Sequence, residues 1–383
     1  MSIAVKSQKH LFQIPENEHY LNCASMAPLL KSVEEAGLKG INKRRYPGHF
    51  VASNYFDEVN LLKKHFASLI HAAHPEEIAI IPSASYGMAN AIQNVCPKKG
   101  GHALILQGEF PSGRLALERW CEDHAQELKE IGPGSADSLD GKALNQRVLE
   151  AIKPESSILV MSCVHWMNGI RFDMKAISAR CQETKTLLIV DGTQGVGVSP
   201  MDVQEYKIDA LICAGYKWLM GPYSVAMAYY GPHFHHGRPI EESWRNRTNA
   251  QAFSDLTDYG RIYIPMAGRY EVGEASNFIS IPMQSEGIRQ VMEWSPAAIS
   301  SYCRNLMQPL YAVLKKNGQE VDPTHQSAHI QGIYPPEGMS PAKFSEKLAE
   351  KNIRTSVRGA YIRVSTHLFN EEQDIQALID CMS

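Results

Sequence analysis

The sequence lacks the features that mark several protein classes. It has no run of about 18 apolar residues, so we expect no membrane-spanning helix. The stretch 1–16 is polar and has no apolar core of signal-peptide length. The formal net charge is −3, and no long block of Lys or Arg stands out. Charge therefore favours neither nucleic acid nor a membrane as a partner.

Cysteine occurs, but never in the spacing of a zinc site or a disulfide framework. The eight cysteines are scattered, and no Cys-x-x-Cys is present. His233, His235 and His236 cluster, but their spacing matches no common zinc pattern and favours a solvated loop. We therefore expect no metal site, reduced thiols and a cytoplasmic location.

A dinucleotide-binding glycine motif is also missing. The nearest match, 195–200, runs into Pro200 and lacks the third glycine. Because this motif is absent, we do not expect the protein to be an NAD-type oxidoreductase.

The chain itself is of ordinary globular composition. It has 383 residues, 44% of them hydrophobic and 21% charged, a length that suggests roughly two domains. Strand-like and helix-like segments alternate from about 77 to 232. This alternation predicts an α/β fold with a three-layer, doubly wound, mainly parallel sheet. The expected strands are 77–82, 102–106, 157–163, 187–190, 210–213 and 225–229.

The remaining segments predict two further parts. After about 270, helical stretches at 341–351 and 371–381 mix with strand-like stretches at 328–333 and 360–364, which is typical of a small α+β domain. We predict an N-terminal arm (1–20) that joins this small domain, a large cofactor-binding domain (21–265) and the small C-terminal domain (266–383).

Two polar residues follow neighbouring apolar runs. Asp191 closes the run 187–190, and Lys217 follows the run 210–213. If these runs are adjacent parallel strands, both side chains emerge at the same sheet edge, where ligands of open α/β sheets bind. A carboxylate for a pyridinium nitrogen and a lysine for an aldehyde are what pyridoxal phosphate requires. The alternative for Asp191 is a turn cap, and for Lys217 a solvated side chain.

Other residues fit contacts to the same cofactor. The segment Ser83-Ala84-Ser85 begins a predicted helix whose N–H groups can bind the phosphate, although serine caps are common. Gln194 is placed to donate to the phenolate oxygen of the cofactor, or is an exposed loop amide. Phe110 follows a strand and can stack on the cofactor ring, or is a core aromatic.

Two residues complete the expected site. His165 follows the run 157–163 and is a second polar contact for the cofactor. Arg363 lies on a late strand-like stretch and suits bidentate binding of a substrate carboxylate. A surface arginine on an edge strand is the alternative for Arg363.

Together these segments resemble the class V aminotransferase family of fold-type I pyridoxal-phosphate enzymes, over nearly the whole chain. The family includes cysteine desulfurases, kynureninase and isopenicillin-N-epimerase-like proteins. The segments that carry the resemblance are 20–28, 83–90, 191–195, 215–222 and 362–370.

The resemblance implies further roles and a homodimer with sites at the subunit interface. It places Asn22 near the substrate and Tyr216 beside the cofactor. It also implies that a polar residue of the neighbouring subunit, Ser276 or Asn277 here, reaches the phosphate. Ala214 stands where a phosphate-binding serine is common.

One departure bears on the reaction. Desulfurases carry a nucleophilic cysteine shortly before the late arginine strand, but 353–359 contains none. We therefore expect an enzyme that acts on a small amino acid through a Schiff base on Lys217, with aminotransferase as the default outcome. A lyase acting at the β-carbon, like kynureninase or selenocysteine lyase, is the alternative; a non-catalytic sensor is disfavoured by Lys217, Asp191 and Arg363 together. The substrate, the amino acceptor and the pathway stay open.

Overall fold

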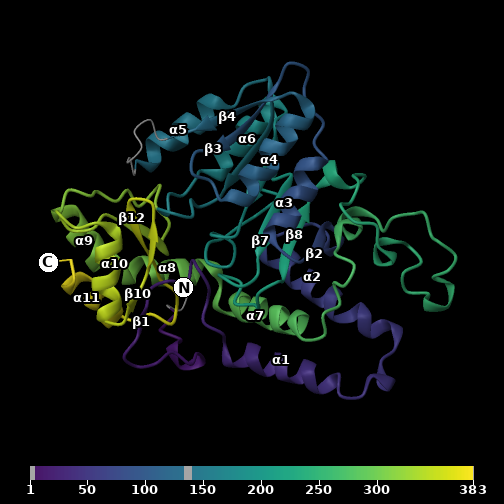
Figure 1. The fold of residues 1–383 in the computed structure, drawn as a ribbon, viewed down its shortest axis with the longest axis horizontal. Coiled ribbons are helices and arrows are strands. Elements are labelled where there is room, and N and C mark those ends of the chain that lie inside the picture. The colour runs from purple at the N-terminus through teal and green to yellow at the C-terminus, as the bar shows by residue number, and fades with distance from the viewer. Residues whose placement is uncertain (1–4, 133–139, 383) are drawn as a thin grey trace.

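The large sheet forms the centre of the molecule (Figure 1). In this computed structural model, which describes residues 5–132 and 140–382, the sheet has seven strands in the order β2-β8-β7-β6-β5-β3-β4. Strands β7, β6, β5, β3 and β4 run parallel, whereas β8 is antiparallel to both β7 and β2. The strands are β2 (Ile78–Ile81), β3 (His102–Leu106), β4 (Glu127–Ile131), β5 (Ser156–Ser162), β6 (Leu187–Asp191), β7 (Ala210–Ala214) and β8 (Ala226–Tyr230).

Helices cover both faces of this sheet. Along β5, Ile158 and Val160 belong to one hydrophobic cluster, and Leu159 and Met161 to another. Because successive side chains of a strand point to opposite faces, this division places one core on each side of the sheet. The predicted three-layer α/β architecture is confirmed. The helices are α1 (Lys31–Lys43), α2 (Asp57–Leu69), α3 (Ala84–Gln93), α4 (Pro111–His124), α5 (Gly141–Ala151), α6 (Met174–Thr184) and α7 (Ser280–Trp294).

One strand of the large sheet was not expected from the sequence. Strand β4 lies at the sheet edge, and the side chains of Glu127, Lys129 and Glu130 are exposed. A charged edge strand lacks the apolar run that marks the central strands, and edge charge discourages pairing with other chains. The other strands begin and end within about two residues of the expected segments.

The C-terminal elements gather on one side of the large sheet, drawn in green (α8) to yellow (α11) in Figure 1. They form an antiparallel sheet in the order β11-β12-β9, with a separate hydrophobic core that includes Leu348 and Ile362. The elements are α8 (Pro296–Leu306), α9 (Gln308–Lys316), β9 (Ile330–Ile333), α10 (Pro341–Glu350), β10 (Ile353–Arg354), β11 (Ser356–Arg358), β12 (Tyr361–Ser365) and α11 (Glu372–Asp380).

The N-terminal segment is attached to these C-terminal elements. Strand β1 (His19–Tyr20) pairs in parallel with β10, and the backbone N–H of Gln8 donates to the carbonyl of Leu368. Residues 1–4 of the expected arm lie outside the described residues. The domain boundaries at 20/21 and 265/266 remain predictions.

Three structural findings bear on the function classes. No helix within 5–132 and 140–382 combines the length and apolarity needed to cross a membrane. Over the same residues, no group of three His, Cys, Asp or Glu side chains is arranged to hold a metal ion. The eight cysteines, all of them described, are free thiols.

Candidate active site

The site forms where β6 and β7 end side by side. Asp191 is the last residue of β6 and is the register partner of Ile212 in β7, so the two strands are parallel neighbours as expected. Lys217 follows the end of β7 at the same sheet edge. The loop after β6 packs closely on the lysine loop: Gly197 has φ of 96°, and a Cβ there would lie 2.6 Å from the carbonyl oxygen of Trp218.

Lys217 is nearly buried, with 8% of its surface exposed. Burial lowers the pKa of its amine to about 8, against the opposing effect of the nearby Asp191 carboxylate. The positive charges of Arg363 and Arg358 lower this pKa further. The lowered pKa therefore gives Lys217 a larger neutral fraction near pH 7 than an exposed lysine has, and the neutral amine is the nucleophilic form.

Asp191 both caps a turn and faces the lysine. Its Oδ1 accepts a hydrogen bond from the backbone N–H of Thr193 at 2.9 Å, so the turn-cap role is present. Burial raises the pKa of Asp191, and the bonds from Thr193 and the charge of Lys217 oppose that rise. A cationic group at this buried carboxylate would favour its ionised form.

An aromatic side chain lies over the lysine. The Lys217 Nζ is 5.8 Å from the ring centroid of Phe110 and 5.5 Å from that of Tyr216. Phe110 precedes the first residue of α4 and is 39% exposed, so it is not a core aromatic. Its ring makes an edge contact with Trp166 at 5.5 Å. The exposed ring is available to cover a flat ligand.

Glu109 holds Phe110 in place, a role that the sequence reading missed. Its carboxylate is buried and accepts from the backbone N–H of Phe110 (2.9 Å) and of Ser162 (2.7 Å), so it joins the ends of two strands. Burial raises its pKa to about 7. A carboxylate three residues after the end of an apolar strand was the only signal in the sequence.

His165 offers an unpaired ring nitrogen inside the protein. The side chain is buried, and its Nδ1 makes no hydrogen bond of normal geometry among the described residues, although the Gln107 backbone and the Asn168 side chain are near enough to oppose the lowering of its pKa. Burial lowers its pKa to about 4, so the ring is neutral at physiological pH. Because buried polar atoms are normally paired, this nitrogen fits a contact to a bound group.

The expected phosphate segment forms a helix start. The Ser83 hydroxyl accepts from the Tyr86 N–H at 3.2 Å and thus caps α3, while the Ser85 and Ser112 hydroxyls bond each other at 2.7 Å. The first N–H groups of a helix have no partner within the helix. Ala84 and Ser85 therefore present donors of the kind that bind phosphate.

The side chain of Gln194 is buried and ties three segments together. Its Nε2 donates to the carbonyl of Ala24 at 3.1 Å, and its Oε1 accepts from Trp218 Nε1 at 2.8 Å. The surface-loop alternative is therefore wrong for Gln194. A primary amide carries two N–H donors, so one remains for the phenolate oxygen of a cofactor.

Arg363 and Asn22 meet at the small sheet. Arg363 is 1% exposed; its Nη1 donates to the carbonyl of Trp166 (2.8 Å) and its Nη2 to the Ser25 hydroxyl (3.1 Å). The Oδ1 of Asn22 accepts from the Ser356 hydroxyl at 2.7 Å. Burial lowers the pKa of Arg363 to about 9. The surface-arginine alternative is thus wrong, and the guanidinium lies close enough to Lys217 to influence its pKa.

Ser276 and Asn277 lie elsewhere in the chain. They line a cavity of about 410 Å³ together with Tyr55 and Trp244. Lys217 is not among the residues that line this cavity. The contribution of Ser276 and Asn277 to the site of a second copy remains a prediction.

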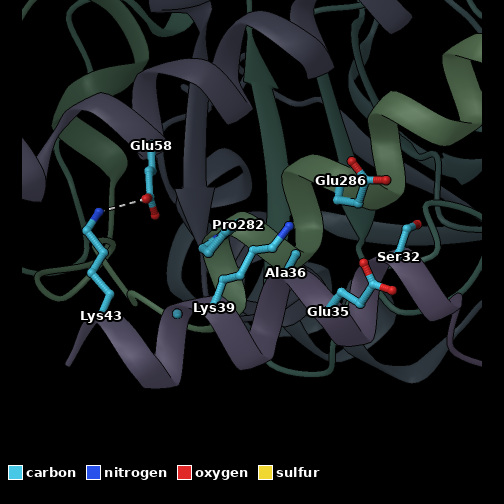
Figure 2. A pocket seen from close by; sticks show the side chains of 9 residues that line it. Ser32, Glu35, Ala36, Lys39, Lys43, Glu58, Pro282 and Glu286 are labelled. Carbon is cyan, nitrogen blue, oxygen red and sulfur yellow. Dashed lines mark hydrogen bonds and ion pairs between the residues drawn. The ribbon is translucent and has the colours of Figure 1, made fainter. Parts of the chain in front are cut away.

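A different surface groove lies between α1 and α7, as Figure 2 shows. It has a volume of about 360 Å³, and the Lys43–Glu58 ion pair lies at one end. Its walls come from α1, α2 and α7 and include none of the expected cofactor residues. The groove is therefore separate from the sheet-edge site. Its lining is Ser32, Glu35, Ala36, Lys39, Gly40, Lys43, Glu58, Pro282 and Glu286.

The residues at the sheet edge fit pyridoxal phosphate. A nearly buried lysine lies within electrostatic range of a buried carboxylate and close to an exposed aromatic ring, while a helix start and an imidazole with an unpaired nitrogen follow β2 and β5 of the same sheet. Each of these groups has a chemical counterpart on the cofactor.

Comparisons with known proteins support the same assignment. The Aminotransferase class-V family profile matches residues 39–378. The uncharacterized aminotransferase YcbU of Bacillus subtilis (strain 168) is 23% identical over 331 residues, covering 85% of this chain and 83% of that protein. The kynureninase of Bacillus thuringiensis subsp. konkukian is 25% identical over 298 residues, 74% of this chain and 66% of that protein. The apo cysteine desulfurase of Thermococcus onnurineus NA1 has a TM-score of 0.82 at 16% identity, covering 99% of this chain and 98% of the other.

Proposed function

This chain belongs to the class-V aminotransferase family of pyridoxal-phosphate enzymes, and from that premise we propose that it transfers the amino group of a small amino acid, with Lys217 as the catalytic residue. The observation that carries this proposal is the position of Lys217. It is nearly buried, its pKa is lowered to about 8, and it lies at the edge of the large sheet with the Asp191 carboxylate, within electrostatic range of the Arg363 guanidinium of the small sheet.

Different side chains of this protein bind different parts of the cofactor. When bound, pyridoxal phosphate withdraws electrons from the substrate's α-carbon. Asp191 holds the pyridine nitrogen in its protonated form by its negative charge, and Phe110 covers one face of the ring. Ser83, Ala84 and Ser85 bind the phosphate through the start of α3, together with Tyr216 and, from the second copy of a homodimer, Ser276 or Asn277.

Three side chains act closer to the reacting atoms. Lys217 binds the cofactor through Nζ and, once released, moves a proton to and from the substrate's α-carbon. Arg363 orients the substrate carboxylate through its planar guanidinium, with Asn22 beside it. Gln194 and His165 contact the polar edge of the cofactor. The segment 353–359, which forms β10 and β11, contains no cysteine, so sulfur transfer by a thiolate there is disfavoured.

A lyase that cleaves the substrate at its β-carbon is the second candidate. It is favoured by the kynureninase relative and by Tyr216, which precedes the lysine as a tyrosine also does in kynureninase. Both reactions use the same proton movements at Lys217, so the groups around the substrate side chain decide between them.

The visible absorption spectrum tests the proposal. Purified protein supplied with pyridoxal phosphate should develop a yellow band, and one L-amino acid of a panel should convert the band to that of the amino form of the cofactor. A band that persists while alanine or another cleaved fragment accumulates would establish the lyase instead. If no band develops, the proposed function is wrong, and only the assignment of the fold still holds.

A further inference from the structure

Two arginines, not one, converge at the substrate side of the site. The Nη2 of Arg358 donates to the Ser25 hydroxyl at 3.2 Å, and the Nη2 of Arg363 donates to the same oxygen at 3.1 Å. The two nitrogens are therefore no further apart than the sum of these distances. Like charges at such a separation repel each other, so this arrangement is energetically unfavourable unless an anion binds between the two groups.

The register of the small sheet places the two arginines on one face. Ser356 is the register partner of Arg363, and Arg358 is the partner of Tyr361. Residues two positions apart on a strand share a face, so Arg358 and Arg363 are diagonal neighbours across β11 and β12. The sheet thus builds a double cation, with Ser25 between the two guanidinium groups.

Neither arginine has a carboxylate partner among residues 5–132 and 140–382. Their other bonds run to neutral groups: Arg358 Nη1 donates to the Val357 carbonyl, and Arg363 Nη1 to the Trp166 carbonyl. The Nε atoms of both are buried and unpaired. By contrast, Arg354 on the adjoining strand β10 forms an ion pair with Glu18 at 2.9 Å.

The environment of Arg358 orients its guanidinium toward the site. Its Cζ is 5.5 Å from the ring centroid of Trp166, the same ring that contacts Phe110. Burial lowers the pKa of Arg358, and its charge lowers the pKa of both Lys217 and Arg363. The half-buried Arg358 therefore acts electrostatically on the active site.

We propose that Arg358 binds a second anionic group of the substrate, so that the preferred substrate is a short dicarboxylate, as an acidic amino acid or as the corresponding 2-oxo diacid. This inference rests on the proposed function, in which Arg363 holds the α-carboxylate. One carboxylate satisfies one guanidinium fork, and the second fork then remains for the side-chain carboxylate. The short distance between the two forks suits two carboxylates on a short carbon chain.

Binding to the protein without cofactor tests the proposal independently of activity. Succinate, glutarate and acetate are titrated by calorimetry at low ionic strength into the wild type, Arg358→Gln, and the matched control Arg354→Gln. We expect the wild type and the control to bind a dicarboxylate at least about tenfold more tightly than acetate, and Arg358→Gln to lose that preference. Equal binding of acetate and dicarboxylates by the wild type would overturn the proposal.

Thermal unfolding of the same variants separates this role from a structural one. In ligand-free protein, Arg358→Gln should unfold at the same or a higher temperature, because the substitution removes a charge that repels Arg363. Stabilisation by added succinate should then be smaller than in the wild type. A lower unfolding temperature without ligand would show that Arg358 is a structural residue, which contradicts the proposal.

The holoenzyme identifies the source of the dicarboxylate and tests the premise. With pyridoxal phosphate added, both variants should develop the yellow band. In Arg358→Gln the kcat/KM for an acidic amino acid, or for a 2-oxo diacid acceptor, should fall at least about tenfold relative to alanine or pyruvate. Equal losses for acidic and neutral substrates would mean that both arginines bind one carboxylate, and would overturn the inference. Absence of the band in every variant would instead refute the proposed function, while the calorimetry on unloaded protein would still report on Arg358.

Discussion

This protein has two groups of buried or half-buried cations, which differ in whether a carboxylate of the chain forms an ion pair with them. The paired cluster consists of Lys63, Arg245 and Glu271: the Lys63 Nζ lies 2.9 Å from Glu271 Oε1, and the Arg245 Nε lies 3.3 Å from Oε2. Arg245 Nη1 also donates to the Ser276 hydroxyl at 2.8 Å. Each cation of this cluster reaches a carboxylate within the chain, so the cluster is complete without a ligand.

The edge cluster consists of Lys217, Arg358 and Arg363. In the described residues, none of these three cations has a carboxylate within ion-pair distance, although Asp191 is close enough to raise the pKa of Lys217. Burying a charge without a partner is costly, and folded proteins keep such groups mainly where they serve function. The comparison teaches that ion pairing distinguishes two kinds of cation. Those paired with a carboxylate of the chain stabilise the fold, and those without such a partner are available to bind an anionic ligand.

The largest expected effect tests the edge cluster at its lysine. Lys217→Met should lower the rate of amino-group transfer on the order of 10⁴-fold or more and abolish the yellow band. Its free energy of unfolding at pH 7 should stay equal or rise, because burial disfavours the charged amine that predominates below about pH 8. Lys63→Met is the matched control and should keep the band but lose stability. If the Lys217→Met protein retained activity, the proposed mechanism would be wrong.

The paired cluster should respond in the opposite way. Glu271→Gln leaves Lys63 and Arg245 without their shared carboxylate, and should lower the free energy of unfolding by about 3–5 kcal/mol. Glu18→Gln, which breaks the partly exposed pair with Arg354, should cost less than about 1 kcal/mol. Urea denaturation measures both values. Similar losses for the two variants would remove the distinction between this cluster and an exposed ion pair.

Arg363 should matter to the substrate and little to the fold. Arg363→Lys keeps the charge but loses the planar fork, so kcat/KM should fall on the order of 10²-fold while the midpoint of urea unfolding changes little. Arg354→Lys, in the neighbouring strand β10, should leave kcat/KM within about twofold of the wild type. An unchanged kcat/KM in Arg363→Lys would place the α-carboxylate elsewhere.

The smallest effect is on pH dependence. Only the neutral Lys217 amine can bind the cofactor covalently, so below about pH 8 the rate of cofactor uptake should rise about tenfold per pH unit, and level off above that pH. In Arg358→Gln the levelling should move to a higher pH, because the positive charge that lowers the Lys217 pKa is gone. Stopped-flow absorbance measures the profile. A profile that is flat from pH 6 to 9 would mean that Lys217 does not limit uptake.

Several features of the site followed from the amino-acid pattern. The apolar runs before Asp191 and Lys217 predicted adjacent strands, which β6 and β7 are. The family resemblance drawn from the cofactor-binding segments was confirmed as well. Strand β4 was missed because its charged residues lie at the sheet edge, and Glu109 because a single carboxylate after a strand is a weak signal.

The local sequence predicts the strands because a strand that is buried on both faces of a sheet requires a continuous apolar run. Polar residues that follow such runs in parallel strands lie at the same sheet edge. The local sequence does not show which charged side chains form ion pairs. Whether an arginine has a partner depends on segments distant in the chain: Ser25 from the N-terminal loop lies between Arg358 and Arg363, whereas Glu271 lies between Lys63 and Arg245. Fold class and the aspartate–lysine pair could therefore be derived from the residues in order, but the unpaired double cation emerged only from tertiary contacts, because these decide which charges are left for a ligand.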